Sequence, residues 1–118
     1  MKKRPKIRPA TKEDMESFYP GFKWTFRAYV AEIEDRIIGI GGIYYVPPYV
    51  IAFSTFKPEM DEYPMTKLRG MKKIMEIVKD RTCLAAADKN FPGSSKLLER
   101  LGFEHIEGRI YRWTPSQE

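Results

Sequence analysis

The chain has 118 residues, of which 42% are hydrophobic and 14% aromatic, and these values indicate one globular domain rather than a disordered chain. No stretch reaches the roughly 20 apolar residues of a membrane span, and no apolar signal-peptide run follows the basic start. Cys83 is the single cysteine, so we expect neither an internal disulfide nor a cysteine-based metal site. The composition therefore predicts a cytoplasmic protein without structural metal.

The net charge is +5, from 21 basic and 16 acidic side chains. A basic balance favours polyanions such as nucleic acid, or a phosphate-bearing cofactor. Much of the excess lies at the N-terminus and over residues 67–81, where a solvated helix face and a basic tail explain it more simply. We therefore expect no nucleic-acid partner. A nucleic-acid-binding protein would instead show salt-dependent retention on DNA.

The first part of the sequence predicts a strand, a helix and a sheet. Residues 7–10 favour an extended start, and Thr11 and Asp14 have the spacing of a helix capping box. Pro20-Gly21 ends that helix. Three runs rich in strand-forming residues then predict an antiparallel meander, at 26–34, 37–46 and 49–56. The three glycines of the middle run predict a bulge or a close backbone approach.

The second part predicts helix, strand, helix and hairpin. An apolar stripe at helical spacing predicts a helix over 64–80, and the small residues 82–87 predict a strand buried on both faces. A helix over 94–101 ends at Gly102, and a hairpin turns at Glu107-Gly108. The order β-α-β-β-β-α-β-α-β-β predicts one α/β (α+β) domain over 1–118, with a mixed, mostly antiparallel sheet and helices on both faces. Residues 1–5 form a basic tail, and 114–118 should fray.

This order resembles the GNAT superfamily of N-acetyltransferases. The opening Ile7-Arg8-Pro9-Ala10-Thr11-Lys12-Glu13-Asp14 looks like the family's start, and Leu101-Gly102-Phe103 looks like its fourth conserved segment. The small size and the missing second helix resemble phage-encoded members, including the internal virion protein of short-tailed phages. The resemblance implies an acetyl-CoA-dependent enzyme acting on a small-molecule or protein amine. A phage-encoded member would work inside the host cell or the virion.

The resemblance also implies where the cofactor lies. The sheet would splay between 49–56 and 82–87, and acetyl-CoA would occupy the opening. Its pantetheine would run along the 49–56 edge, and its pyrophosphate would meet backbone N–H groups at the start of helix 64–80. The implied cofactor contacts are Phe53, Ser54, Thr55, Tyr63, Met65, Thr66, Lys67, Asn90 and Ser94.

The segment that would hold the pyrophosphate departs from the family pattern. Residues 60–66 lack the spaced glycines that let a backbone approach phosphate, and Pro64 removes one N–H donor. Carboxylates stand where the anion would lie and could satisfy the helix dipole themselves, at Glu59, Asp61 and Glu62. This segment therefore also fits a capped helix start without a ligand.

The sequence also leaves the identity of the catalytic residues undecided. Leu98 occupies the position at which the family often has a tyrosine that protonates the leaving thiolate, so Tyr111 and Tyr63 are candidate substitutes. Glu32 is the candidate general base, because a charge on an apolar strand needs a reason; the alternative is a strand position that faces outward.

These departures keep a second interpretation open, namely a catalytically inactive GNAT-like binding module such as a phage virion or host-interaction protein. Exposed aromatic residues such as Trp24 and Trp113 would then serve a protein partner. We expect His105 to be a strand residue and Cys83 to be a small buried core residue.

Overall fold

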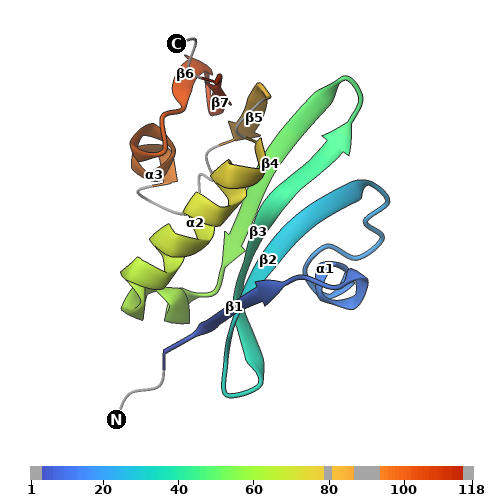
Figure 1. The fold of residues 1–118 in the computed structure, drawn as a ribbon, viewed down its shortest axis with the longest axis vertical. Coiled ribbons are helices and arrows are strands. Elements are labelled where there is room, and N and C mark those ends of the chain that lie inside the picture. Colours follow the sequence, from blue (N-terminus) through green and yellow to red (C-terminus); the bar gives the residue numbers. More distant parts are fainter. Residues whose placement is uncertain (1–3, 79–80, 87–93, 116–118) are drawn as a thin grey trace.

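One mixed sheet with helices on both sides makes up the computed structural model, which describes residues 4–78, 81–86 and 94–115. Figure 1 shows α1 on one side of the sheet and α2 and α3 on the other. The elements are β1 (Lys6–Pro9), α1 (Lys12–Phe18), β2 (Thr25–Ile33), β3 (Arg36–Val46), β4 (Tyr49–Phe56), the 3₁₀ helix η1 (Pro58–Glu62), α2 (Pro64–Val78), β5 (Cys83–Ala86), α3 (Ser94–Arg100), β6 (Glu104–Glu107) and β7 (Ile110–Trp113).

The predicted fold class and order of elements are confirmed. The strands lie in the order β1-β2-β3-β4-β5-β7-β6, and every neighbouring pair is antiparallel except β4 and β5, which are parallel. The structure has one element that was not predicted, the short η1 between β4 and α2. The predicted helix over 64–80 is described as far as Val78, because residues 79–80 lie outside the described part of the chain.

The start of the chain is held by the predicted capping box. The Asp14 backbone N–H donates to Thr11 Oγ1 over 3.1 Å, and the Thr11 N–H donates to Asp14 Oδ2 over 2.8 Å. The Arg8 guanidinium also donates to Asp14, over 2.8 Å, and to Glu32, over 2.9 Å. One arginine on β1 therefore ties α1 and β2 together, and its hydrogen bond is the main cause that lowers the pKa of Asp14.

The predicted irregularity of the glycine-rich strand is confirmed. The register between β2 and β3 shifts between Ala31 and Glu32, which is a β-bulge. Farther along, a Cβ added to Gly42 would lie 2.2 Å from the Arg27 carbonyl oxygen and 2.5 Å from Ala28 Cα. Both of these are backbone atoms that no rotamer change can move, so β2 and β3 approach too closely for a side chain at this position.

The core is divided by the sheet. The α2 side buries the larger cluster, which contains Ile43, Ile74, Val78, Leu98 and Phe103 among others. The α1 side buries Met15, Ala28, Val30 and Ile40. The prediction that residues 82–87 are buried on both faces is wrong, because β5 alternates buried Cys83 and Ala85 with less buried Leu84 and exposed Ala86.

A glycine substitution tests the close approach of β2 and β3. We expect Gly42→Ala to destabilise the protein by about 2–3 kcal/mol, the upper part of the usual range for overpacking, since its new methyl group meets backbone atoms. The matched control is Gly70→Ala on α2, where the nearest atom, Ile7 Cδ1, is 3.8 Å from the added Cβ. This variant should be stabilised by up to about 1 kcal/mol through helix propensity. Urea unfolding of both variants measures the difference, and equal midpoints would contradict the close approach.

The ion pair between Arg8 and Asp14 predicts that the stability of the fold depends on pH. Because the folded state lowers the pKa of Asp14, the ionised form stabilises the fold above the ordinary carboxyl pKa of about 3.9, and this contribution disappears as pH falls through the lower folded value. Asp14→Asn should therefore lower the melting temperature near pH 6 more than near pH 2.5. The exposed Asp61→Asn is the control and should shift neither value appreciably. Melting curves across this pH range decide, and a pH-independent loss in Asp14→Asn would contradict the mechanism.

Candidate functional site

Within the described chain, strand β4 has an open edge at residues 53–56. Its parallel ladder with β5 contains the pairs Ile51–Leu84 and Ala52–Ala85. Residues 53–56 continue to pair with β3 on the other side, but on the β5 side they have no partner strand within the described chain. β5 ends at Ala86, and residues 87–93 lie outside the described chain; the sheet was expected to splay at this part of β4. An extended ligand can pair with such an edge, because its N–H and C=O groups are not used by a neighbouring strand.

The N-terminus of α2 follows this edge after a few residues. η1 carries the chain from Phe56 to Pro64, and the Lys67 N–H donates to the Tyr63 carbonyl oxygen over 3.1 Å in the first turn. The Lys67 ammonium lies 4.7 Å from the centroid of the Phe56 ring. The helix dipole places partial positive charge here, next to a lysine and to the end of the open strand.

The carboxylates of η1 are arranged differently from the prediction. Glu59 does not cap α2, because its carboxylate forms an ion pair with Arg36, which lowers the pKa of Glu59. Asp61 and Glu62 are exposed, and within the described residues neither forms a hydrogen bond or an ion pair. Within the described residues no carboxylate of η1 therefore accepts a hydrogen bond from the start of α2, although two acidic side chains remain on the preceding turn.

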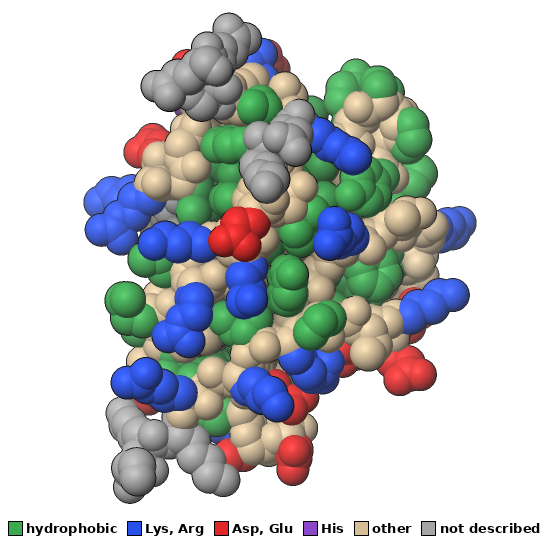
Figure 2. Space-filling view, viewed as in Figure 1, with side chains coloured by type: hydrophobic (Ala, Val, Ile, Leu, Met, Phe, Trp, Pro, Cys, Tyr) green, Lys and Arg blue, Asp and Glu red, His purple; other side chains and the backbone are tan. Residues whose placement is uncertain are grey.

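The exposed surface of α2 is basic. The helix carries Lys67, Arg69, Lys72 and Lys73 against one acid, Glu76. Figure 2 shows that Lys and Arg side chains outnumber Asp and Glu side chains on this face of the molecule. The electrostatic potential on this side therefore favours an anionic ligand at the open edge.

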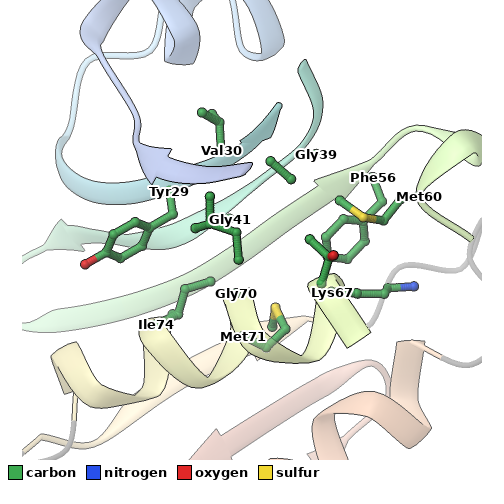
Figure 3. Close-up of a pocket in the computed structure, with 13 residues that line it drawn as sticks. Tyr29, Val30, Gly39, Gly41, Phe56, Met60, Lys67, Gly70, Met71 and Ile74 are labelled. Atoms are coloured by element: carbon green, nitrogen blue, oxygen red, sulfur yellow. The ribbon is translucent and has the colours of Figure 1, made fainter. Parts of the chain in front are cut away.

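A small apolar cavity lies between α2 and the sheet. It has a volume of about 30 Å³ and is lined by glycines of β3 and α2, with Thr66 and Lys67 at one end. Figure 3 shows Gly70, Met71 and Ile74 of α2 across the cavity from Gly41, with Lys67 close to Phe56. A cavity of this size holds only one or two water molecules, so it is not the site of a large cofactor.

The predicted contacts on β4 divide between the two sides of the sheet. Phe53 and Thr55 face α1, where the Tyr19 hydroxyl forms a hydrogen bond with Thr55 Oγ1 and the Tyr19 ring lies 5.6 Å from that of Phe53. Ser54 faces α2, as the alternation of a strand requires. What these three residues share is the backbone edge of β4, which is the feature that would serve a cofactor.

The other predicted contacts lie at or near the start of α2. Tyr63 packs against the cluster around Met60, whereas Met65 is 68% exposed beside the helix start. Thr66 is buried, and Lys67 lies over Phe56. Asn90 lies outside the described residues. Ser94 is the first residue of α3, and its side chain is also outside the described part.

The predicted catalytic residues lie away from the open edge. Glu32 is on the α1 side of β2, with β3 between it and β4, and its carboxylate accepts two hydrogen bonds from Arg8. Tyr111 is buried on β7, in register with Ala85, so two strand spacings, about 10 Å, separate it from Ala52 on β4. Their roles as base and acid stay predictions.

The cysteine and the histidine lie where the sequence analysis placed them. Cys83 is fully buried, and burial raises the pKa of its thiol to about 11. The thiolate is the nucleophilic form, so Cys83 is unsuited to covalent catalysis near neutral pH. His105 lies on β6, with Nε2 2.7 Å from the Gly108 carbonyl oxygen.

A group of aromatic residues on the α1 side of β4 was not predicted from the sequence. Their rings are partly exposed and in mutual contact, and they are Tyr19, Phe22, Phe26, Tyr44 and Phe53. The alternation of Tyr44, Ile51 and Phe53 on neighbouring strands was the available signal. Trp24 is 48% exposed, as expected, but Trp113 is not, because it packs against the α2-side core beside Gly102.

The described residues hold no group of three or more side chains suited to bind a metal ion. Among the helices of the described chain, none has the length and apolar character to span a membrane.

No protein-family model matches the sequence, and no curated protein does. Solved structures do match the fold. The ribosomal-protein-S18-alanine N-acetyltransferase from Escherichia coli superimposes with a TM-score of 0.67 at 13% identity, over 97% of this chain and 96% of that one. AtaTR bound with AcCoA gives 0.58 at 11% identity, over 93% and 92%. A Bacillus subtilis acetyltransferase in complex with CoA gives 0.56 at 15% identity, over 92% and 96%.

The state of Cys83 gives a simple test. We expect a thiol-reactive reagent such as dithionitrobenzoate to leave Cys83 unmodified in the native protein at pH 7–8, because the thiol is buried and its pKa is about 11. Modification should become complete after unfolding in guanidinium chloride, as absorbance at the reagent's wavelength would show. Fast reaction of the native protein would contradict the burial of β5.

Proposed function

From the GNAT-like fold that this chain shares with N-acetyltransferases, we propose that it is an acetyl-CoA-dependent N-acetyltransferase acting on an amine acceptor. The observation that carries the proposal is the open edge of β4 at residues 53–56, followed closely by the N-terminus of α2. An extended amide chain that ends in a diphosphate matches these two features in order. The first supplies hydrogen-bonding groups and the second supplies a positive end.

The chain's own groups would divide the work of binding. The backbone of residues 53–56 pairs with the amides of the pantetheine arm. The first N–H groups of α2 and the Lys67 ammonium attract the diphosphate. Arg36 offsets the charge of Glu59, so the acidic η1 opposes an anion less than its sequence suggests. Asn90 and Ser94 remain proposed contacts for the rest of the cofactor.

Acetyl transfer requires few side-chain groups. An amine nitrogen attacks the thioester carbonyl, the C–N bond forms, the C–S bond breaks, and the thiolate takes up a proton. Backbone N–H groups of β4 would polarise the carbonyl. We retain Glu32 as the proposed base and Tyr111 as the proposed acid. Glu32→Gln and Tyr111→Phe are the conservative variants that test them by their effect on the pH profile of kcat.

A second candidate function rests on the segment between β4 and α2. It has no glycine, Pro64 removes an N–H, and Asp61 and Glu62 add negative charge. These features favour a GNAT-like binding module without catalysis, such as a phage virion or host-interaction protein. It would bind a protein partner and no acetyl-CoA.

A titration of acetyl-CoA separates the two functions. We expect a micromolar Kd by isothermal titration calorimetry, and Lys67→Ala should weaken binding about fivefold, which is a typical contribution of about 1 kcal/mol for a charge near a helix N-terminus. Lys73→Ala is the matched control. Lys73 also lies over an aromatic ring, that of Tyr29, but it is farther along the helix, so its loss should leave the Kd within twofold.

The same titration with desulfo-CoA should give a similar Kd, since the diphosphate and the pantetheine amides are retained. Absence of binding at millimolar acetyl-CoA would overturn the proposed function and leave the binding module. An equal effect of Lys67→Ala and Lys73→Ala would place the diphosphate away from the start of α2.

A further inference from the structure

A second cavity lies beside the C-terminal end of α2. Its walls come from the turn between β3 and β4 and from the residues that connect α2 to β5, and they include Tyr45, Pro47, Pro48, Tyr49, Arg81 and Thr82. The cavity has a volume of about 400 Å³. This volume lies in the lower part of the 300–1,000 Å³ range that is usual for small-molecule sites, so the cavity suits one small ligand.

This cavity is separate from the proposed cofactor site. The cofactor site lies at the start of α2 and the cavity at its end, and a helix of 15 residues is about 22 Å long. Along β4, Val50 at the cavity is three residues, about 10 Å, from Phe53 at the open edge. Figure 1 shows the turn between β3 and β4 at the opposite end of β4 from the start of α2. A ligand in this cavity would therefore leave the cofactor site free.

Arg81 presents a guanidinium group at the wall of the cavity. Its Cζ lies 5.7 Å from the centroid of the Tyr45 ring, and its backbone N–H donates to the Val78 carbonyl oxygen over 2.8 Å. Within the described residues the Arg81 guanidinium forms no ion pair. Stacking on an aromatic ring uses the face of a guanidinium, so the N–H donors in its plane stay available to an anion.

Two tyrosine rings give the cavity flat apolar walls. Tyr45 packs against the core on the α2 side of the sheet, so its ring is held in place. Tyr49 is 55% exposed and follows Pro47 and Pro48, whose fixed φ angles stiffen the turn. Aromatic rings favour offset-stacked or edge-to-face contact with other rings. These walls therefore favour a ligand with a planar ring system.

The charge of the cavity selects an anion. Of the described residues that line it, only Arg81 is charged, and none is acidic. A cationic ligand would meet this charge without a carboxylate to offset it, and a neutral ligand would leave the guanidinium donors unused. A carboxylate or a phosphate accepts two parallel hydrogen bonds from a guanidinium, and the Thr82 hydroxyl at the wall can donate a further one.

We propose that this cavity binds a planar aromatic molecule that carries an anionic group, either a carboxylate or a phosphate. The ring system lies against Tyr45 and Tyr49, and the anion accepts paired hydrogen bonds from Arg81. The volume admits one ring system with its substituents, a molecule about the size of a mononucleotide. The site does not depend on the proposed acetyltransferase function, because none of its residues belongs to the cofactor site.

The test is isothermal titration calorimetry on the full chain with four probes. They are 5′-inosine monophosphate, inosine, indole-3-acetate and inorganic phosphate. We expect the nucleotide, the indole carboxylate or both to bind with a Kd below about 1 mM. Inosine lacks the anion and inorganic phosphate lacks the ring, so each should bind at least tenfold more weakly than the nucleotide. The tighter of the two aromatic anions shows whether the site takes a nucleotide phosphate or an aromatic carboxylate.

Variants locate the bound probe. Arg81→Gln should weaken binding of the aromatic anion at least tenfold, as expected for hydrogen bonds to a charged group, whereas Arg81→Lys keeps the charge without the paired geometry and should weaken it about threefold. Tyr49→Ser removes one ring and should weaken binding about fivefold. Arg69→Gln is the matched control, because Arg69 is an exposed arginine of α2 that does not line the cavity. It should leave the Kd unchanged.

Several results would overturn this site. One is no binding of either aromatic anion at several millimolar, and another is equal affinity for inosine and its monophosphate. A Kd unchanged in Arg81→Gln together with a lower melting temperature would make Arg81 only a partner of the α2 dipole. Saturating acetyl-CoA should leave the Kd of the probe within twofold, and displacement would place the probe in the cofactor site instead. If acetyl-CoA does not bind, the proposed function fails, and the probes and variants still decide this site.

Discussion

Strands β4 and β5 run parallel and share only two residue pairs, and this short pairing determines the arrangement of the rest of the site. In a regular parallel pair the facing backbone N–H and C=O groups of the two strands hydrogen-bond along the length of the pair. Here β4 keeps its pairing with β3 but leaves its other edge open from Phe53 onward in the described chain. The chain then turns through η1 into α2, so backbone hydrogen-bonding groups and a helix dipole lie in sequence along one path.

The two sides of the sheet differ because of how they are covered. On one side α2 packs its apolar stripe against β2, β3 and β4. The cavity that remains there, about 30 Å³, is too small for a cofactor. On the other side α1 has two turns, and Arg8 fixes its position by joining Asp14 to Glu32. The absence of a further helix on that side of the described chain leaves aromatic rings partly in contact with solvent. The open edge of β4 thus separates a filled side from an accessible one.

The sequence was sufficient for the fold because each element carries a local signal. The capping residues Thr11 and Asp14 and Gly102 beyond the last helix act within a few residues, and the structure retains them. The site was less predictable, because it depends on long-range contacts. Nothing local indicates that Arg36 binds Glu59, 23 residues away, or that Tyr19 meets Thr55, 36 residues away. Trp113 was placed at the surface because its burial depends on packing beside Gly102.

The buried thiol of Cys83 constrains how acetyl transfer proceeds under the proposed function. Cys83 is the one cysteine of the chain, and in its protonated, enclosed state it cannot carry the acetyl group between two half-reactions. In the proposed direct attack of the amine on the thioester, donor and acceptor occupy the protein together. The kinetics would be of the sequential, ternary-complex type, with double-reciprocal plots that intersect rather than run parallel. The open edge of β4 meets this requirement. An acceptor can approach it from the aromatic side of the sheet while the cofactor occupies the end next to α2.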